Sequence, residues 1–154
     1  MSPVSMEIPG GPTLFTNLVL DFTGTLAQGG TLVPGVGDRL RRLASSLRIT
    51  VLTADTFGTV EREMTGLPVS VQIIADGREK AEIVGGLGAD EVIAVGNGRN
   101  DIPMMKVAGL GIAVMGPEGS AAGLLPVADV VTRDINDALD LVLDPLRLKA
   151  TLRD

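Results

Sequence analysis

The chain has 154 residues, a formal net charge of −6, and neither cysteine nor histidine. These absences exclude disulfides, thiolate chemistry, histidine-ligated zinc and imidazole catalysis, so any metal site must use oxygen ligands, which favours Mg²⁺. The acidic balance speaks against a nucleic-acid partner, and no apolar stretch approaches the roughly 18 residues of a membrane span. Because the start shows no signal-peptide pattern, we expect a soluble, cytoplasmic protein with one domain over residues 1–154.

In chain order, the first predicted elements are an N-terminal hairpin and a series of buried strands. The segment SMEIPGGPTLF predicts a short strand, a Pro-Gly-Gly-Pro turn and a lead-in to the central strand, which we expect as an edge hairpin. Short apolar runs that are mostly continuous then predict strands covered on both faces. These runs span residues 18–21, 49–53, 71–74, 92–95, 111–114 and 129–132.

Amphipathic segments between these runs predict helices. Apolar residues recur at spacings of three and four in the groups Val36, Leu40, Leu43, Leu47; Phe57, Val60, Met64; and Ile135, Leu139, Val142, the last with Asp134 as N-cap. Pro103 and Pro117 fit the first turns of two short helices. The alternation predicts an α/β fold, a doubly wound, mainly parallel sheet in Rossmann-like three-layer α/β/α form.

Polar residues follow the ends of three predicted strands, where ligands bind in doubly wound sheets. They lie in DFTGT at 21–25, TAD at 53–55 and GNGRND at 96–101, and Lys80 is near the start of the helix before the last of these strands. This set suits phosphoryl transfer. A carboxylate can attack phosphorus, Mg²⁺ lets two anions approach, and hydroxyl, ammonium and turn N–H groups can hold the phosphoryl oxygens.

DFTGT, LTAD, Lys80 and GNGRND, in this order, resemble the four motifs of the haloacid dehalogenase-like superfamily. The closer resemblance is to the phosphorylation domain of P-type ATPases, with its Asp-Lys-Thr-Gly-Thr, Thr-Gly-Asp and Gly-Asp-Gly-x-Asn-Asp motifs. The run GIAVMGPEGSAAGLLPVADVV also resembles the segment after the last of those motifs. The resemblance extends over residues 17–143 and is specific as a set, whereas each motif alone is weak.

The resemblance implies a role for each matching residue. Asp21 becomes the nucleophile, Thr53 the phosphate-binding hydroxyl and Lys80 the lysine that neutralises charge. The implied catalytic set is Asp21, Thr23, Thr53 and Lys80; the phosphate-binding set is Phe22, Thr23, Gly24, Thr53, Ala54 and Lys80; and the Mg²⁺ set is Asp21, the backbone carbonyl of Thr23, Asn97 and Asp101.

The sequence departs from the family pattern at three points. Phosphatases of the superfamily carry an Asp where Thr23 stands, and a hydroxyl is a poor general acid or base near neutral pH. We therefore expect slow release of phosphate and a preference for good leaving groups: acyl phosphates, nucleoside triphosphates or p-nitrophenyl phosphate. Asn97 replaces a metal-binding Asp, which predicts weaker metal binding unless Asp101 or Asp55 compensates. Only about 30 residues separate Asp21 from Thr53, so we expect no cap domain.

Other interpretations stay open from the sequence. The chain is either a phosphohydrolase or a non-enzymatic module that binds phosphate or a partner, its chemistry weakened at Thr23 and Asn97. A receiver-like switch is a third possibility, but only Glu7 precedes Asp21, whereas receivers need an acidic pair there. Asp55 and Asp101 also suit helix capping. An uncapped site further predicts a homo-oligomer acting on a small phosphorylated substrate.

Overall fold

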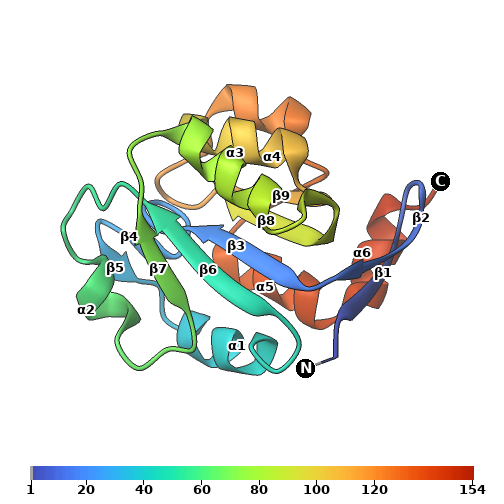
Figure 1. Ribbon diagram of the computed structural model, residues 1–154, viewed down its shortest axis with the longest axis horizontal. Helices are drawn as coiled ribbons and strands as arrows, with labels where there is room; N and C mark the ends of the chain where they lie inside the picture. Colours follow the sequence, from blue (N-terminus) through green and yellow to red (C-terminus); the bar gives the residue numbers. More distant parts are fainter. Residues whose placement is uncertain (1) are drawn as a thin grey trace.

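The computed structural model describes residues 2–154, and its centre is a six-stranded sheet in which every pairing is parallel. The strand order is β10-β9-β8-β3-β6-β7 (Figure 1). The bounds are β3 (Asn17–Asp21), β6 (Arg48–Thr53), β7 (Ser70–Ile73), β8 (Val92–Gly96), β9 (Leu110–Val114) and β10 (Val130–Thr132). This sheet confirms the predicted doubly wound α/β fold.

The central strand β3 is buried along its whole length, as are β8 and β9. Such strands are covered on both faces, which explains why their sequences are continuous apolar runs. The register pairs Asp21 with Leu52 on one side and Leu20 with Val95 on the other. The carboxyl ends of β3, β6 and β8 therefore meet at one edge of the sheet.

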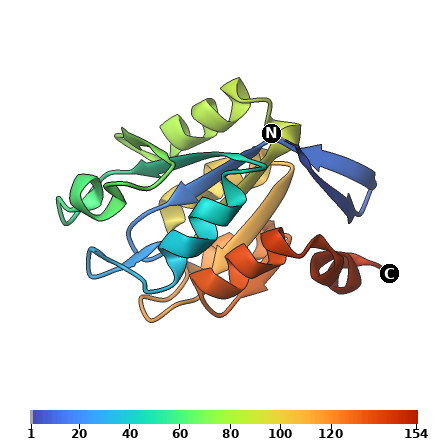
Figure 2. The same ribbon diagram turned by 90° about the horizontal axis from the view of Figure 1, so that it is seen from below.

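Helices cover both faces of the sheet (Figures 1 and 2). The pair α3 (Gly77–Gly86) and α4 (Ile102–Val107) packs over one face, where Val19 lies in the core cluster that contains Val84 and Met104. The pair α1 (Val36–Leu43) and α5 (Ile135–Leu143) packs over the other, with Leu18 and Leu20. Alternate residues of β3 thus belong to opposite cores, as the two-residue period of a strand requires.

The N-terminal hairpin forms, but it is not an edge of the main sheet. Strands β1 (Val4–Ile8) and β2 (Gly11–Phe15) pair with each other in a separate two-stranded sheet. The hairpin lies beside α6 (Pro145–Leu152), a helix that the sequence analysis did not predict, at the far end of the molecule in Figure 1. Met6 and Leu148 are buried, so the hairpin's apolar face is covered by this helix instead of by a neighbouring strand.

Three helix predictions are wrong in detail. Pro117 lies in a turn, and the short helix that follows is a 3₁₀ helix over Ala122–Val127. Phe57 precedes α2 (Val60–Met64) and is half exposed, because a turn with positive φ at Gly58 separates it from the helix. Leu47 is buried but lies beyond the end of α1.

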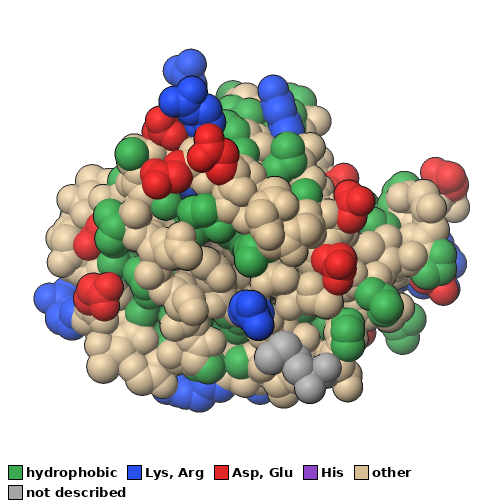
Figure 3. Space-filling model, in the orientation of Figure 1, with side chains coloured by type: hydrophobic (Ala, Val, Ile, Leu, Met, Phe, Trp, Pro, Cys, Tyr) green, Lys and Arg blue, Asp and Glu red, His purple; other side chains and the backbone are tan. Residues whose placement is uncertain are grey.

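A small second hairpin follows β3. It consists of β4 (Ala27–Gln28) and β5 (Thr31–Leu32), and we call residues 27–32 the flap. Residues 22–47 hold only the flap and α1, and residues 54–76 hold only α2 and β7. In residues 2–154, no helix is both long and apolar enough for a membrane crossing. Acidic and basic side chains are scattered over the face seen in Figure 3.

Candidate active site

Asp21, Lys80 and Asp101 form a buried ionic cluster at the carboxyl edge of the sheet. The Nζ of Lys80 donates to Asp21 Oδ1 at 2.8 Å and to Asp101 Oδ1 at 2.7 Å. Lys80 and Asp101 are 0% exposed, and Asp21 is 5% exposed. Charged side chains are almost never fully buried unless they are paired. The structure therefore brings together three of the residues that the sequence singles out, from positions up to 80 apart in the chain.

Each member of the cluster is placed by a regular element. Asp21 is the last residue of β3, and Lys80 lies one turn into α3, whose N-cap Asp76 accepts a bond from the Glu79 N–H. Asp101 Oδ2 accepts from the backbone N–H groups of Asn97 at 3.1 Å and Gly98 at 3.0 Å. Asp101 thus stabilises the loop that precedes it. Its side chain makes no capping hydrogen bond to α4, so the prediction that it caps the helix entered at Pro103 is wrong.

Burial dominates the electrostatics of the cluster. Desolvation raises the pKa of Asp21 to about 7; the neighbouring Asp101 carboxylate acts in the same direction, and Lys80 opposes both. For Lys80, burial alone lowers the pKa, but the carboxylates of Asp101 and Asp21 outweigh it, and its pKa is raised. Lys80 therefore stays protonated, and its ammonium is shared by the two carboxyl groups.

The turn after Asp21 is held by its own backbone and by Thr25. The Gly24 N–H donates to Ala27 O at 2.9 Å, and Thr23 pairs with Ala27 in an isolated bridge. Thr25 Oγ1 is 3.4 Å from Asp21 Oδ2, a long contact that leaves this oxygen largely free. Thr23 Oγ1 is buried without a partner in the described part of the chain. Such an orphaned hydroxyl is a candidate for contact with a ligand.

Phe22, by contrast, is fully buried in the core, so only its backbone can face a ligand. Thr53 is 1% exposed at the end of β6, beside β3, and its Oγ1 accepts from the Asp55 N–H at 2.9 Å. Because that bond uses an oxygen lone pair, the hydroxyl hydrogen remains available for a phosphoryl oxygen. Ala54 follows directly.

Asp55 caps α2 instead of joining the ionic cluster. Its Oδ1 accepts from the backbone N–H groups of Thr59 at 3.0 Å and Val60 at 3.1 Å. Its φ of 56° is positive, a conformation that Asp tolerates better than most residues. The structure therefore gives Asp55 a structural role at the start of α2, although Thr59 is the N-cap residue and Phe57 lies outside the helix.

The donors near Asp21 have the chemistry that Mg²⁺ requires. The hydroxyl oxygen of Thr25 lies 3.0 Å from Asn97 Oδ1, to which it donates, and 3.4 Å from Asp21 Oδ2, so these two oxygens lie around one point. Carboxylate, amide and carbonyl oxygens are hard ligands, and Mg²⁺ keeps several waters beside one or two carboxylates. In residues 2–154, no three acidic side chains form a group that could hold a metal. The fit to Mg²⁺ therefore rests on the hard oxygen ligands around Asp21 and Asn97.

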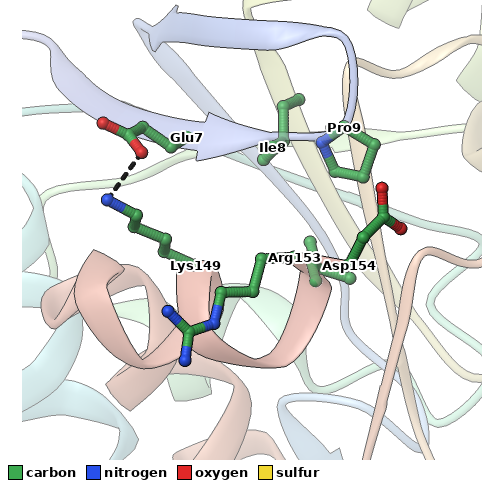
Figure 4. A pocket seen from close by; sticks show the side chains of 7 residues that line it. Glu7, Ile8, Pro9, Lys149, Arg153 and Asp154 are labelled. Atoms are coloured by element: carbon green, nitrogen blue, oxygen red, sulfur yellow. Dashed lines mark ion pairs between the residues drawn. The ribbon is translucent and has the colours of Figure 1, made fainter.

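A pocket of about 180 Å³ lies away from this cluster, between the N-terminal hairpin and α6. Figure 4 shows the ion pair from Lys149 to Glu7 spanning it, at 2.7 Å. Its lining holds no buried charged residue and no member of the ionic cluster. The concavity alone therefore does not mark the site.

Comparison with known proteins identifies the family. Residues 65–141, half of the chain, match the family described as haloacid dehalogenase-like hydrolase. The chain belongs to this family. The matched segment includes Lys80, Asn97 and Asp101, whereas Asp21 precedes it. The finer likeness to the phosphorylation domain of P-type ATPases stays a prediction.

The haloacid dehalogenase-like fold is also found among solved structures. The deoxy-D-mannose-octulosonate 8-phosphate phosphatase of Haemophilus influenzae, in its cobalt-bound form, has a TM-score of 0.71 at 13% identity, covering 91% of this chain and 94% of that one. The 3-deoxy-D-manno-octulosonate 8-phosphate phosphatase of Moraxella catarrhalis, in complex with magnesium, phosphate and a KDO molecule, has a TM-score of 0.64 at 20% identity, covering 90% of this chain and 94% of that one. An uncharacterised protein of Methanocaldococcus jannaschii is 53% identical over 64 residues, 42% of this chain and 69% of that protein.

Sequence reasoning missed Thr25 and the loop over residues 116–121. The Ala121 N–H donates to Asn97 O at 2.8 Å, so this loop lies against the GNGRND segment. The signal was present in the glycines of GPEG, since Gly116 and Gly119 both adopt positive φ. Glycine takes such conformations without steric cost.

Proposed function

We propose that the chain is a Mg²⁺-dependent phosphohydrolase that acts through an aspartyl phosphate on Asp21. The observation that carries the proposal is the state of the Asp21 carboxylate. One oxygen is fixed by the buried Lys80 at 2.8 Å, and the other has only the 3.4 Å contact with Thr25. A buried carboxylate with one fixed and one free oxygen is oriented for attack.

The free oxygen of Asp21 attacks phosphorus, the bond to the leaving group breaks, and that group departs with the electron pair. Water then attacks the phosphorus, the bond to Asp21 breaks, and inorganic phosphate is released. Lys80, the Thr53 hydroxyl and the backbone of the 22–24 and 53–54 turns hold the phosphoryl oxygens. Asp21, the Thr23 carbonyl and Asn97, with Asp101 behind them, would hold Mg²⁺, which supplies charge neutralisation between the two anions.

Thr23 directs the substrate preference. Since the hydroxyl cannot protonate a leaving oxygen efficiently near pH 7, substrates whose leaving groups are stable anions react faster. Acyl phosphates, aryl phosphates and nucleoside triphosphates meet this condition, and simple sugar phosphates do not. The relatives solved with similar folds include sugar-phosphate phosphatases, but at 13–20% identity they support the fold and not the substrate.

The test is turnover of acetyl phosphate, p-nitrophenyl phosphate and glucose 6-phosphate with and without Mg²⁺. We expect the first two to be hydrolysed faster, and Asp21→Asn to abolish turnover. Asp38→Asn, which changes a carboxylate at the exposed start of α1, is the matched control. Activity retained in Asp21→Asn refutes the nucleophile, and equal rates on all three substrates refute the leaving-group argument.

A catalytically weakened binding module is the second candidate, because Thr23 and Asn97 remove two carboxylates from the family pattern. Binding of beryllium fluoride with Mg²⁺, without turnover of any substrate, would favour it. The homo-oligomer is likewise a prediction, which size-exclusion chromatography checks.

A further inference from the structure

Asn97 is joined to three different segments by four hydrogen bonds. Its Oδ1 accepts from Thr25 Oγ1 at 3.0 Å, and its Nδ2 donates to Gly119 O at 3.0 Å. Its backbone N–H donates to Asp101 Oδ2 at 3.1 Å, and its backbone carbonyl accepts from the Ala121 N–H at 2.8 Å. Every polar group of this residue is therefore engaged within the protein.

The orientation of the amide follows from its partners. Gly119 O can only accept a hydrogen bond, so the group that faces it must be the NH₂. An aspartate at this position would place a carboxylate oxygen against that carbonyl, where two acceptors repel. The Gly119 contact thus requires the amide and is not available to the carboxylate that the family pattern has here.

The fit around Asn97 is close on the side of the nucleophile. A Cβ built on Gly24 would come within 2.4 Å of Asn97 Nδ2, so the turn after Asp21 reaches the amide only because residue 24 is glycine. A Cβ on Gly116 would lie 3.6 Å from the Gly24 carbonyl, so the 116–121 loop also contacts this turn.

The 116–121 loop in turn holds the flap. Glu118 Oε2 accepts from the Gly29 N–H at the tip of the flap at 2.7 Å. The tip is held on its other side by Thr59 Oγ1, which donates to Gly30 O at 2.6 Å. A chain of contacts therefore runs from Asn97 through the loop to Gly29.

We infer that Asn97 is a positioning residue, which fixes the 116–121 loop, and through Glu118 the flap, against the nucleophile turn without any metal. Where the family has an aspartate, this chain thus has an asparagine that lacks the negative charge of a metal ligand but makes the hydrogen bond to Gly119. The role of Asn97 in Mg²⁺ binding rests on the proposed function, but its role in positioning the 116–121 loop does not.

The test uses the metal-free protein in EDTA, with amide hydrogen exchange measured by NMR. Asn97→Asp keeps the shape and the Thr25 contact and removes only the donor to Gly119. We expect the exchange rate of the Ala121 amide to rise about tenfold, the scale of one hydrogen bond lost together with a new acceptor clash. The heteronuclear NOE of Gly29 should fall with it. Asn97→Ser, which is smaller and uncharged, should also raise the Ala121 rate.

Glu118→Ala is the matched control, since it cuts the chain of contacts one step later. It should lower the NOE of Gly29 and leave Ala121 exchange within twofold of the unmodified protein. Unchanged Ala121 exchange in both Asn97 variants, or an equal rise in Glu118→Ala, overturns the inference.

A separate arm measures Mg²⁺ by calorimetry, where Asn97→Asp should bind about tenfold more tightly because ligand charge sets affinity. Weaker or unchanged Mg²⁺ binding overturns the inference that the asparagine gives up metal affinity for its contact with Gly119. Absence of Mg²⁺ binding in both proteins would count against the proposed function. The amide hydrogen-exchange rates of Ala121 would still test the positioning role of Asn97.

Discussion

Replacing Lys80 with methionine tests the ionic cluster directly. Methionine has a similar length but no charge, so Lys80→Met leaves Asp21 and Asp101 facing each other without the ammonium that now bonds to both at 2.8 and 2.7 Å. All three side chains are 7% exposed or less, so water cannot replace the lost partner. Breaking a buried ion pair by removing one partner costs about 3–5 kcal/mol.

We therefore expect Lys80→Met to lower the free energy of unfolding by about 3–5 kcal/mol. The assay is urea unfolding followed by circular dichroism, in EDTA at pH 7.5. Lys106→Met, at an exposed position of α4, is the control and should change stability by less than about 0.5 kcal/mol.

A double variant separates charge from packing. Adding Asp101→Asn to Lys80→Met replaces one of the two carboxyl groups that lose the ammonium, and coupled residues in one network interact by about 0.5–3 kcal/mol. The double variant should therefore be less destabilised than the sum of the two single ones. A loss below about 1 kcal/mol in Lys80→Met, or strict additivity in the double variant, would refute the account of the cluster as a mutually dependent unit.

Three further predictions concern single residues. Thr23→Asp should raise phosphate release about tenfold or more by restoring a general acid and base, as single-turnover kinetics with acetyl phosphate can show; an unchanged rate means that Thr23 is not limiting. Gly96→Ala places a Cβ 2.4 Å from the carboxylate of Asp101, and should cost about 1–3 kcal/mol in urea unfolding, so a neutral result argues against that close packing. Asp140→Asn breaks the two-bond contact of Arg39 between α1 and α5, and should lower the free energy of unfolding by at most about 1 kcal/mol because the pair is a third exposed. Since Arg39 lowers the pKa of Asp140 in the folded protein, this contribution to stability is present above the unfolded pKa near 4 and disappears as pH falls through the lower folded value. Urea unfolding of both proteins from pH 7 to pH 2 can check this.

The sequence predicts the centre of this fold better than its periphery. Strands β3, β8 and β9 are buried on both faces, so the same hydrophobic requirement acts on every residue and leaves a continuous run. The N-terminal hairpin is different, because its partner is α6, which begins 130 residues after the end of β2. Local alternation identifies a hairpin but carries no information about which distant element covers it, and this is why the edge placement was wrong.

The residues of the site also fall into a group that the sequence predicts and a group that it does not. Asp21, Lys80 and Asp101 could be placed together because parallel strands adjacent in the sheet bring their carboxyl ends to one edge. The contacts of Thr25 and of the 116–121 loop could not, since they depend on turn conformations such as the positive φ of Gly24 and Gly116. Glycine or threonine in a turn is compatible with several loop conformations, and its hydrogen-bond partner depends on which of them the folded chain adopts.

Thr23 and Asn97 are understood best as one change in the charge of the site. With Asp at both positions, as in the family pattern that this sequence resembles, two further carboxylates would lie in the loops beside Asp21 and Asp101, which already share the ammonium of Lys80. Two like charges about 4 Å apart repel by about 4 kcal/mol at an effective dielectric constant of 20, so such a site needs a bound cation to be stable. With threonine and asparagine, only Asp21 and Asp101 remain, and Lys80 bonds to both. Both carboxyl groups of the cluster are then bonded to Lys80, and we expect the same two substitutions to weaken general acid catalysis and metal binding while they lower the negative charge around the cluster.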